Sequence, residues 1–263
     1  MKIEGSTTWI TGASSGIGEG LALVLSRMGA RLVLSSRKRD RLEAVRTRCA
    51  QPDRHLCVPL DLERPPSIQE AVRHVADAVG PVDILINNGG VSQRSLAVDT
   101  SLEVDRRLME INYFGTITLT KALLPSMLER KSGHIVVVTS LMGKMAAPVR
   151  SAYAASKHAL HGFFDALRAE IHDQGIRITL VAPGFIRTQI SVNALTGDGS
   201  PADTMDDAVK AGMDPEVCAH KIARAIERER DEVIIAGREK VGVYIKAFSP
   251  ALYNRIIRKV RVT

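Results

Sequence analysis

Short runs rich in β-branched and aliphatic residues recur along the chain, and each is separated from the next by a stretch with helical spacing. The runs cover residues 7–11, 31–36, 55–61, 82–87, 134–140, 177–183 and 231–236. Strands that alternate with helices build parallel sheets, because a parallel pair needs a long crossover connection. The pattern predicts an α/β fold: a Rossmann-type, doubly wound, parallel sheet of about seven strands with helices on both faces.

The chain of 263 residues, 45% of them hydrophobic, is long enough to bury one large core. No stretch reads as a linker between domains, so we expect a single domain over residues 1–263. The segment from about 190 to 213 contains Gly197, Gly199 and Pro201 and has the weakest pattern for regular structure. We expect it to form a mobile lid over the substrate.

The net charge of +7 could suit nucleic acid or an anionic membrane, yet most basic residues are interspersed with acidic ones. We therefore expect no nucleic-acid partner. The exception is the basic tail, residues 240–263, where Leu252, Ile256, Ile257 and Val260 fall at helical spacing among cations that include Arg261. The tail predicts a short amphipathic helix, and we favour its packing on the body or on a neighbouring subunit over contact with a membrane surface.

Three cysteines, Cys49, Cys57 and Cys218, show no spacing typical of metal sites, so we expect neither a metal nor disulfides. No apolar run approaches the roughly 20 residues of a membrane span, and the first residues lead straight into a strand-like run. These features predict a cytoplasmic location.

A glycine-rich turn follows the first β-like run and leads into an amphipathic stretch. Glycines allow close approach of the backbone, and the free N–H groups at the start of a helix attract a diphosphate. The alternative is a tight strand-to-helix connection without a ligand. The ending typical of a nucleotide-hydrolysing P-loop is absent. The residues expected to contact a dinucleotide are Gly12, Ser14, Ser15, Gly16, Ile17 and Gly18.

The second β-like run ends at Ser35-Ser36-Arg37-Lys38-Arg39. An NAD site usually places a carboxylate here against the ribose 2′-hydroxyl. Instead, Ser36 and Arg37 can bind a 2′-phosphate through charge-assisted hydrogen bonds. We therefore expect NADP(H), although residues 37–41 would also suit the solvated start of a helix.

Tyr153 and Lys157 are four residues apart, which places a phenol and an ammonium on one face of a helix. The cation is expected to lower the tyrosine pKa, so that the phenol can exchange a proton near neutral pH. An isolated pair of this kind usually lies on the protein surface and has no catalytic role. Its interpretation therefore depends on the other motifs.

These motifs resemble the short-chain dehydrogenase/reductase family from near the N-terminus to about Thr188. The matched segments are residues 11–18, Asp61-Leu62, Asn87-Asn88-Gly89-Gly90, with Gly89 in place of the family's alanine, and residues 183–188. Asn112, Ser140, Tyr153 and Lys157 match the catalytic tetrad. The resemblance further implies cofactor contacts from Asp61, Leu62, Asn88, Gly89, Gly90, Tyr153, Lys157, Pro183, Gly184, Ile186 and Thr188.

The resemblance implies hydride transfer between a nicotinamide and a carbonyl or alcohol carbon. Tyr153 would act as general acid or base, and Ser140 would hydrogen-bond the substrate oxygen. Lys157 would bind the nicotinamide ribose, and Asn112 would position a water that relays protons to Lys157. The alternatives are a sensor or scaffold that binds NADPH without turnover, and a basic binding protein on an ancestral fold.

Residues around Asn88, Asn112 and Tyr153 also resemble the dehydrogenase/reductase member 7 subgroup, whose members act on lipid-like carbonyls and carry an N-terminal membrane anchor. This chain shows no comparable apolar run, so we do not expect a shared membrane location. A hydrophobic carbonyl or alcohol substrate is expected to meet Leu141, Met142, Met145 and Phe185. The apolar run Ala154, Ala155, Ala159, Phe163, Phe164 and Leu167 suits a homodimer or homotetramer, or a plain buried helix.

Overall fold

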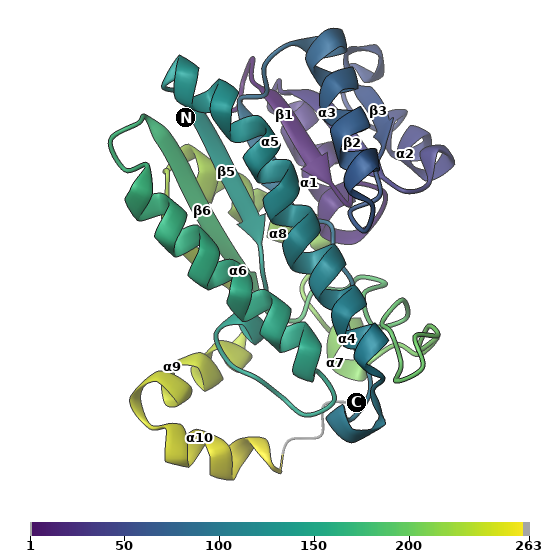
Figure 1. The fold of residues 1–263 in the computed structure, drawn as a ribbon, viewed down its shortest axis with the longest axis vertical. Helices are drawn as coiled ribbons and strands as arrows, with labels where there is room; N and C mark the ends of the chain where they lie inside the picture. Colours follow the sequence, from purple (N-terminus) through teal and green to yellow (C-terminus); the bar gives the residue numbers. More distant parts are fainter. Residues whose placement is uncertain (1, 260–263) are drawn as a thin grey trace.

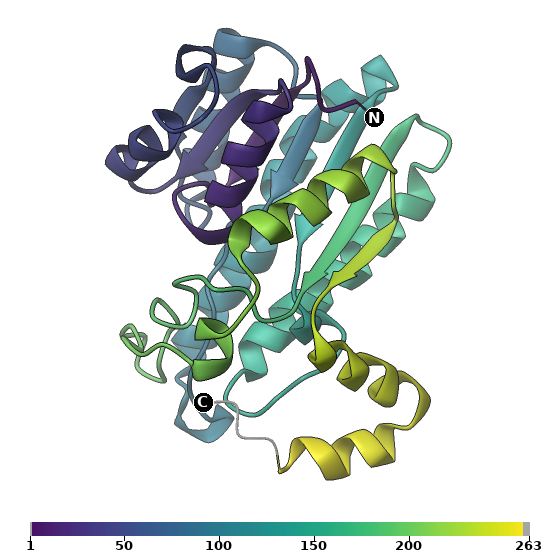
Figure 2. The same ribbon diagram turned by 180° about the vertical axis from the view of Figure 1, so that it is seen from behind.

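The computed structural model describes residues 2–259, which form a twisted sheet covered by helices on both faces (Figures 1 and 2). Within these residues the sheet has the strand order β3-β2-β1-β4-β5-β6-β7, and every neighbouring pair is parallel. The predicted doubly wound sheet is therefore confirmed. Its strands are β1 (Thr7–Thr11), β2 (Arg31–Ser36), β3 (Leu56–Pro59), β4 (Ile84–Asn87), β5 (Gly133–Val138), β6 (Ile176–Pro183) and β7 (Glu232–Ile235).

The first two strands have the predicted bounds, whereas β3, β4 and β7 are shorter than their apolar runs. The shift with most bearing on function is in β5, which ends at Val138 rather than at Ser140. Ser140 instead begins the 3-10 turn η4 (Leu141–Gly143) and accepts the N–H of Met142 at 3.1 Å. A serine that caps a turn competes with the sheet ladder, which explains the early end of the strand.

The helices of the structure are α1 (Gly16–Arg27), α2 (Arg39–Arg46), α3 (Pro65–Val79), α4 (Leu102–Met109), α5 (Gly115–Arg130), α6 (Ser151–Glu170), α7 (Asp207–Lys210), α8 (Pro215–Glu227), α9 (Val241–Phe248) and α10 (Pro250–Ile257). Alternate strand residues pack on opposite faces of the sheet, as the pleat requires. Ile10 and Leu34 join the apolar cluster with α1, α2 and α8, and Trp9 and Val33 join the one with α3, α5 and α6. All four side chains are fully buried. Burial of each large apolar side chain stabilises the folded state by about 1.5–3 kcal/mol.

The chain order reverses beside β1, because β2 pairs with one edge of this strand and β4 with the other. In open α/β sheets a ligand binds beyond the carboxyl ends of the strands at such a switch point. The turn after β1, the loop after β4 and the start of η4 after β5 all lie at this end of the sheet (Figure 1).

The segment from 190 to 213 is irregular, as expected, but it is not detached from the body. Ser191 and Ala194 are fully buried, and Leu195 bridges both Gln93 and Pro201. Its one regular element is the short α7. Its mobility stays a prediction.

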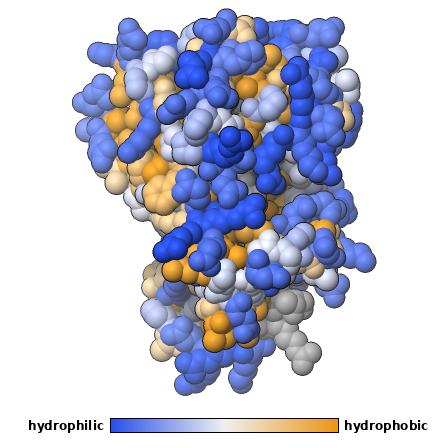
Figure 3. All heavy atoms as spheres, turned by 45° about the vertical axis from the view of Figure 1, so that its right-hand side comes forward, coloured by the Kyte–Doolittle hydropathy of each residue, from blue (hydrophilic) through white to orange (hydrophobic). Residues whose placement is uncertain are grey.

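The basic tail forms two helices rather than one. Val243 and Tyr253 are buried against the body, which agrees with the packing that we favoured. The side of the two helices that faces away from the body also carries apolar side chains, which are exposed; Phe248 is 87% accessible. Figure 3 shows hydrophobic residues among hydrophilic ones at the lower end of the molecule. Val260 and Arg261 of the tail lie outside the described residues. Among the helices described, none combines the length and apolar character needed to cross a membrane.

Candidate functional site

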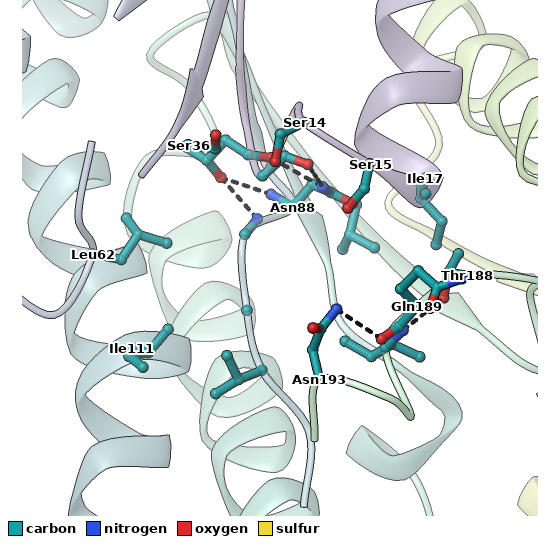
Figure 4. A pocket seen from close by; sticks show the side chains of 18 of the residues that line it. Ser14, Ser15, Ile17, Ser36, Leu62, Asn88, Ile111, Thr188, Gln189 and Asn193 are labelled. Carbon is teal, nitrogen blue, oxygen red and sulfur yellow. Dashed lines mark hydrogen bonds between the residues drawn. The ribbon is translucent and has the colours of Figure 1, made fainter. Parts of the chain in front are cut away.

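A cleft of about 580 Å³ opens at the switch point of the sheet. Its size is typical of cofactor and ligand sites. Figure 4 shows the glycine turn on one side, the loop after β3 with the helical turn before α5 on another, and the segment after β6 on a third, through residues Ser14, Ser15, Ile17, Leu62, Ile111, Thr188, Gln189 and Asn193. The expected residues that line the cleft are Gly12, Ser14, Ser15, Gly16, Ile17, Ser36, Arg37, Asp61, Leu62, Asn88, Gly89, Gly90, Ser140, Tyr153, Lys157, Pro183, Gly184, Ile186 and Thr188. Gly18 and Asn112 lie behind this lining.

The turn between β1 and α1 requires glycine for two different reasons. Gly12 has φ +65°, and a Cβ there would lie 2.8 Å from the Cα of Gly89. Gly18 has an ordinary helical backbone, but a Cβ would lie 2.2 Å from the carbonyl oxygen of Gly12. Ser15 precedes α1 without a capping hydrogen bond from its side chain. The first N–H groups of α1 therefore face the cleft without a side-chain cap, which suits a diphosphate.

Thr11 and Asn88 fix the loop after β4 against this turn. The hydroxyl oxygen of Thr11 accepts the N–H groups of Asn88 and Gly89 at 3.0 and 2.9 Å. The amide of Asn88 donates to the carbonyl oxygens of Thr11 and Gly12 at 3.0 and 3.3 Å. Asn88 thus braces the backbone of the turn, a role that its position in the motif did not reveal.

Basic side chains gather where β2 ends. Arg37, Lys38 and Arg41 all line the cleft beside Ser36, whereas Arg39 turns away and pairs with Glu43. The alternative that residues 37–41 form the solvated start of a helix agrees with the structure for Lys38 and Arg41, which are exposed where α2 begins. Both residues also line the cleft, because the chain bends after Ser36 and begins α2 at its rim.

Ser140, Tyr153 and Lys157 converge from η4 and α6 on the far wall of the cleft. Tyr153 and Ser140 share a hydrogen bond, and Lys157 is almost fully buried. The Lys157 Nζ donates to the carbonyl oxygen of Val138 at 3.1 Å and lies 5.9 Å from the centre of the Tyr153 ring. A bound carbonyl oxygen near Ser140 and Tyr153 would meet two hydroxyl groups.

Burial governs the ionisation of both titratable groups. It raises the pKa of the Tyr153 phenol, while the hydrogen bond with Ser140 and the charges of Arg150 and Arg94 act in the opposite direction. It lowers the pKa of Lys157 to about 8. The sequence led us to expect a lowered tyrosine pKa; the structure gives a raised one, because desolvation of the phenolate outweighs the nearby charges.

Asn112 lies in a π-helical turn, η3 (Glu110–Phe114), between α4 and α5. Single π-turns inside helices often mark functional sites. Its amide oxygen accepts the N–H of Val91 at 2.8 Å, and its amide nitrogen donates to the Val91 carbonyl oxygen and to the Ser156 hydroxyl at 2.9 and 3.0 Å. The side chain thus joins the loop after β4 to α6. The water that the resemblance assigns to Asn112 stays a prediction.

His161 continues the line of Tyr153 and Lys157 along α6, one turn further. Its Nε2 donates at 3.0 Å to the hydroxyl of Thr139, which itself donates to the Val181 carbonyl oxygen at 2.8 Å. His161 therefore steadies the residue before Ser140. The repeated spacing of four residues was visible in the sequence, and the residue was nevertheless missed.

The four side chains expected to face substrate do not line the cleft. Leu141, Met142 and Met145 are buried in a cluster with Val243 and Tyr253 of the tail, and the Phe185 backbone pairs with Met213. The chain after Ser140 turns beneath the tail helices, so its apolar residues pack there. Apolar lining comes instead from Val91, Ile111, Ile190, Leu195, Pro201 and Val209.

Across residues 2–259, no group of three or more His, Cys, Asp or Glu side chains is arranged to hold a metal ion.

The chain resembles known proteins along nearly its whole length. It is 44% identical to the Dehydrogenase/reductase SDR family protein 7-like of Drosophila melanogaster, over 98% of this chain and 81% of that protein. It is 42% identical to Dehydrogenase/reductase SDR family member 7B of Bos taurus, over 97% and 81%. These relatives confirm the resemblance to the member 7 subgroup.

Solved structures agree with this relationship. A short-chain dehydrogenase of Streptomyces avermitilis superposes with a TM-score of 0.83 at 28% identity, covering 99% of this chain and all 100% of the other. A short-chain dehydrogenase of Burkholderia cenocepacia in complex with NADP superposes with a TM-score of 0.80 at 26% identity, covering 98% and 99%. The family model described as short chain dehydrogenase matches residues 6–198. Because this match spans most of the chain and the relatives align along nearly all of it, the chain belongs to the short-chain dehydrogenase/reductase family of oxidoreductases.

Proposed function

We propose that the protein is an NADPH-dependent reductase of hydrophobic carbonyl compounds, with Tyr153 as its proton donor. The observation that carries this proposal is the convergence of Ser140, Tyr153 and Lys157 on a cleft that the glycine turn also lines. The proton chemistry and the dinucleotide site thus face the same space. The Burkholderia relative, with NADP bound, supports the same cofactor here.

The residues present fit NADP(H). The glycine turn and the start of α1 would hold the diphosphate, since the turn lines the cleft and α1 begins without a side-chain cap on its first N–H groups. Arg37, with Lys38 and Arg41, supplies positive charge for a 2′-phosphate. Asp61 and Leu62 would contact the adenine. Further contacts are proposed for Gly90, Pro183, Gly184, Ile186 and Thr188, which line the cleft nearer to Tyr153.

The pKa of Tyr153 is raised, so the phenol carries its proton at neutral pH and is available as a proton donor for reduction. Bound NADPH supplies the hydride for the carbonyl carbon. The Tyr153 hydroxyl donates its proton to the carbonyl oxygen, and the Ser140 hydroxyl donates a hydrogen bond to the same oxygen as negative charge develops there. Lys157 stays largely cationic below a pH of about 8 and would hold the adjacent ribose hydroxyls.

The test is consumption of NADPH with a panel of hydrophobic ketones, quinones and aldehydes. Tyr153→Phe is expected to lower kcat by about 10²-fold or more, since it removes the proton donor and leaves the ring. Tyr244→Phe, which changes a tyrosine exposed on α9, is the matched control and should turn over like wild type. Equal rates for wild type and Tyr153→Phe would contradict the proposal.

Cofactor preference is tested by titrating NADPH and NADH separately. Arg37→Asp should weaken NADPH binding and reverse the preference, whereas Arg39→Asp should not, because Arg39 turns away from the cleft. Equal affinity of the wild-type protein for the two cofactors would overturn the NADP(H) assignment.

The second candidate function is a sensor or scaffold that binds NADPH without turnover. It predicts tight NADPH binding with silence across the panel in both wild type and Tyr153→Phe. A basic binding protein would instead show salt-sensitive association that Tyr153→Phe leaves intact. The close approach of Ser140 to Tyr153 supports the reductase over both.

We also infer a single domain, a cytoplasmic location and a homodimer or homotetramer paired through α5 and α6. The side of α6 that carries Ala155, Ala159 and Phe163 is exposed or half-buried, and Phe114 beside α5 is 45% accessible. Light scattering should report a dimer or tetramer, and Ala155→Arg should shift it toward monomer. A monomeric wild type would contradict the pairing.

A further inference from the structure

The loop after β4 touches both the segment 190–213 and the start of α6. The carbonyl oxygen of Ser92 accepts the N–H of Leu195 at 2.9 Å, and the N–H of Arg94 donates to the Leu195 carbonyl oxygen at 2.8 Å. This parallel bridge is centred on Gln93. The loop therefore connects the cover of the cleft to the helix that carries Tyr153.

Gln93 caps that helix from a distance of about sixty residues along the chain. Its side-chain oxygen accepts the N–H groups of Ala152 and Tyr153 at 2.9 and 3.2 Å. These are the second and third residues of α6, the positions that an N-cap side chain ordinarily satisfies. Arg150, in the N-cap position itself, has no capping hydrogen bond from its side chain. Gln93 is fully buried, and its amide nitrogen donates to Thr100 at 3.0 Å.

Asp206 of the segment 190–213 lies between two arginines. Arg94 Nε donates to both of its carboxylate oxygens, at 3.2 and 3.1 Å, and Arg150 Nη2 donates to Oδ2 at 2.8 Å. All three side chains are more than nine-tenths buried. Two cations share one anion, so removing the anion would leave two buried guanidinium groups repelling each other.

We propose that Asp206 and Gln93 are positioning residues that couple closure of the segment 190–213 over the cleft to the placement of Tyr153. When the segment is closed, Asp206 neutralises part of the charge at the start of α6, and Gln93 holds the first turn of this helix. When the segment moves away from the cleft, Arg94 and Arg150 repel each other. The first turn of α6, which carries Tyr153, is then displaced. The inference rests on the proposed function in that Tyr153 is the proton donor.

The groups around the Tyr153 phenol also make its ionisation a reporter of this junction. They are Ser140 from η4, Lys157 on α6, Arg150 at the start of α6 and Arg94 after β4, with Asp206 between the two arginines. The arginines favour the phenolate, and Asp206 offsets them. Loss of the carboxylate charge should therefore lower the pKa of Tyr153.

The principal test compares Asp206→Asn with Asp207→Asn in the full chain. The first removes the shared charge without changing side-chain size; the second makes the same change at an exposed neighbour. We expect Asp206→Asn to lower kcat by roughly tenfold or more, through misplacement of the reacting group, with KM for NADPH unchanged. The alkaline limb of its pH–rate profile should move to lower pH. Asp207→Asn should match wild type in each respect.

Hydrogen exchange gives a readout that does not depend on turnover. The amides of Ala152 and Tyr153 should exchange faster in Asp206→Asn than in Asp207→Asn, without a comparable change at the end of α6. If Asp206→Asn exchanges faster but the wild-type protein reduces no carbonyl compound, the proposed function is contradicted and the coupling is supported. Wild-type exchange and wild-type kcat in a folded Asp206→Asn would overturn the coupling.

Three further variants separate positioning from general stability. Adding Arg94→Gln to Asp206→Asn removes the excess charge and should restore part of the lost kcat. Gln93→Glu keeps an oxygen for the two N–H groups and should protect them, whereas Gln93→Ala should not. A double variant that is slower than Asp206→Asn, or equal exchange in the two Gln93 variants, would contradict the mechanism.

Discussion

The side-chain amide of Asn112 donates to the hydroxyl of Ser156 at 3.0 Å, and this bond ties the π-helical turn before α5 to the helix that carries Tyr153. Both side chains are fully buried, and Ser156 passes the link on by donating to the carbonyl oxygen of Tyr153 at 2.8 Å. Asn112 and Tyr153 are thereby connected through Ser156.

Asn112→Ala should destabilise the protein by about 2–4 kcal/mol, because it removes three hydrogen bonds, two to the backbone of Val91 and one to the hydroxyl of Ser156. Ser156→Ala removes one bond to Asn112 and should cost about 1 kcal/mol. Urea unfolding measures both. Equal unfolding midpoints for Asn112→Ala and wild type would show that the hydrogen bonds of Asn112 do not stabilise the fold.

Lys157→Met should make the protein more stable at pH 7 while it abolishes turnover. Burial lowers the lysine pKa from 10.5 to about 8, so the unfolded chain binds a proton between these pH values that the folded chain does not. The buried charge therefore costs stability below pH 8, by about 3 kcal/mol, and the cost disappears toward pH 10.5. Unfolding at pH 7 and pH 9.5 should show the advantage of Lys157→Met shrinking; a constant difference would contradict this.

Two buried histidines should make the protein acid-labile. Burial lowers the pKa of His134 and of His161 to about 4, from an ordinary value of 6.5. Unfolded histidines take up protons below 6.5 and folded ones do not, so their contribution is complete above pH 6.5 and is lost as pH falls to 4, at about 3 kcal/mol for each. His134→Gln should show a shallower loss of stability between pH 7 and 5 than wild type, whereas a parallel loss would implicate other groups.

The glycines at 12 and 89 should respond differently to alanine. Gly12→Ala places a side chain at a positive φ and against the backbone of Gly89, so it should reduce both stability and NADPH affinity. At Gly89 the nearest atom to a Cβ is the Cδ1 end of Leu62, 2.8 Å away, which can rotate. Gly89→Ala should melt within a few degrees of wild type; strong destabilisation there would show that Leu62 cannot move.

Much of this fold and site could be predicted from the sequence because the relevant signals are local. The turn from Gly12 to Gly18 follows a strand directly, and Tyr153 and Lys157 are one helical turn apart. Each motif therefore shows its own geometry within a few residues. The doubly wound, parallel sheet follows from the alternation of strand-like and helix-like runs.

The remainder depends on contacts that only the folded chain creates. Asp206 meets Arg94 across 112 residues, and no pattern near either residue indicates the other. Gln93 takes the place of an N-cap that Arg150 does not provide with its own side chain. The direction of the Tyr153 pKa shift was predicted wrongly, because desolvation depends on the whole surrounding structure and a sequence shows only the neighbouring charge.

The pairing of β1 with β4 also determines when the protein can begin to work as it is synthesised. Thr8 faces Ile84, and the glycine turn gains its support from Asn88 once that strand has formed. Pairings between such distant segments are slow to form and delay folding. A nascent chain that has emerged only as far as β3 carries the glycine turn without Asn88 and leaves one edge of β1 unpaired, and such open edges favour aggregation until β4 has emerged.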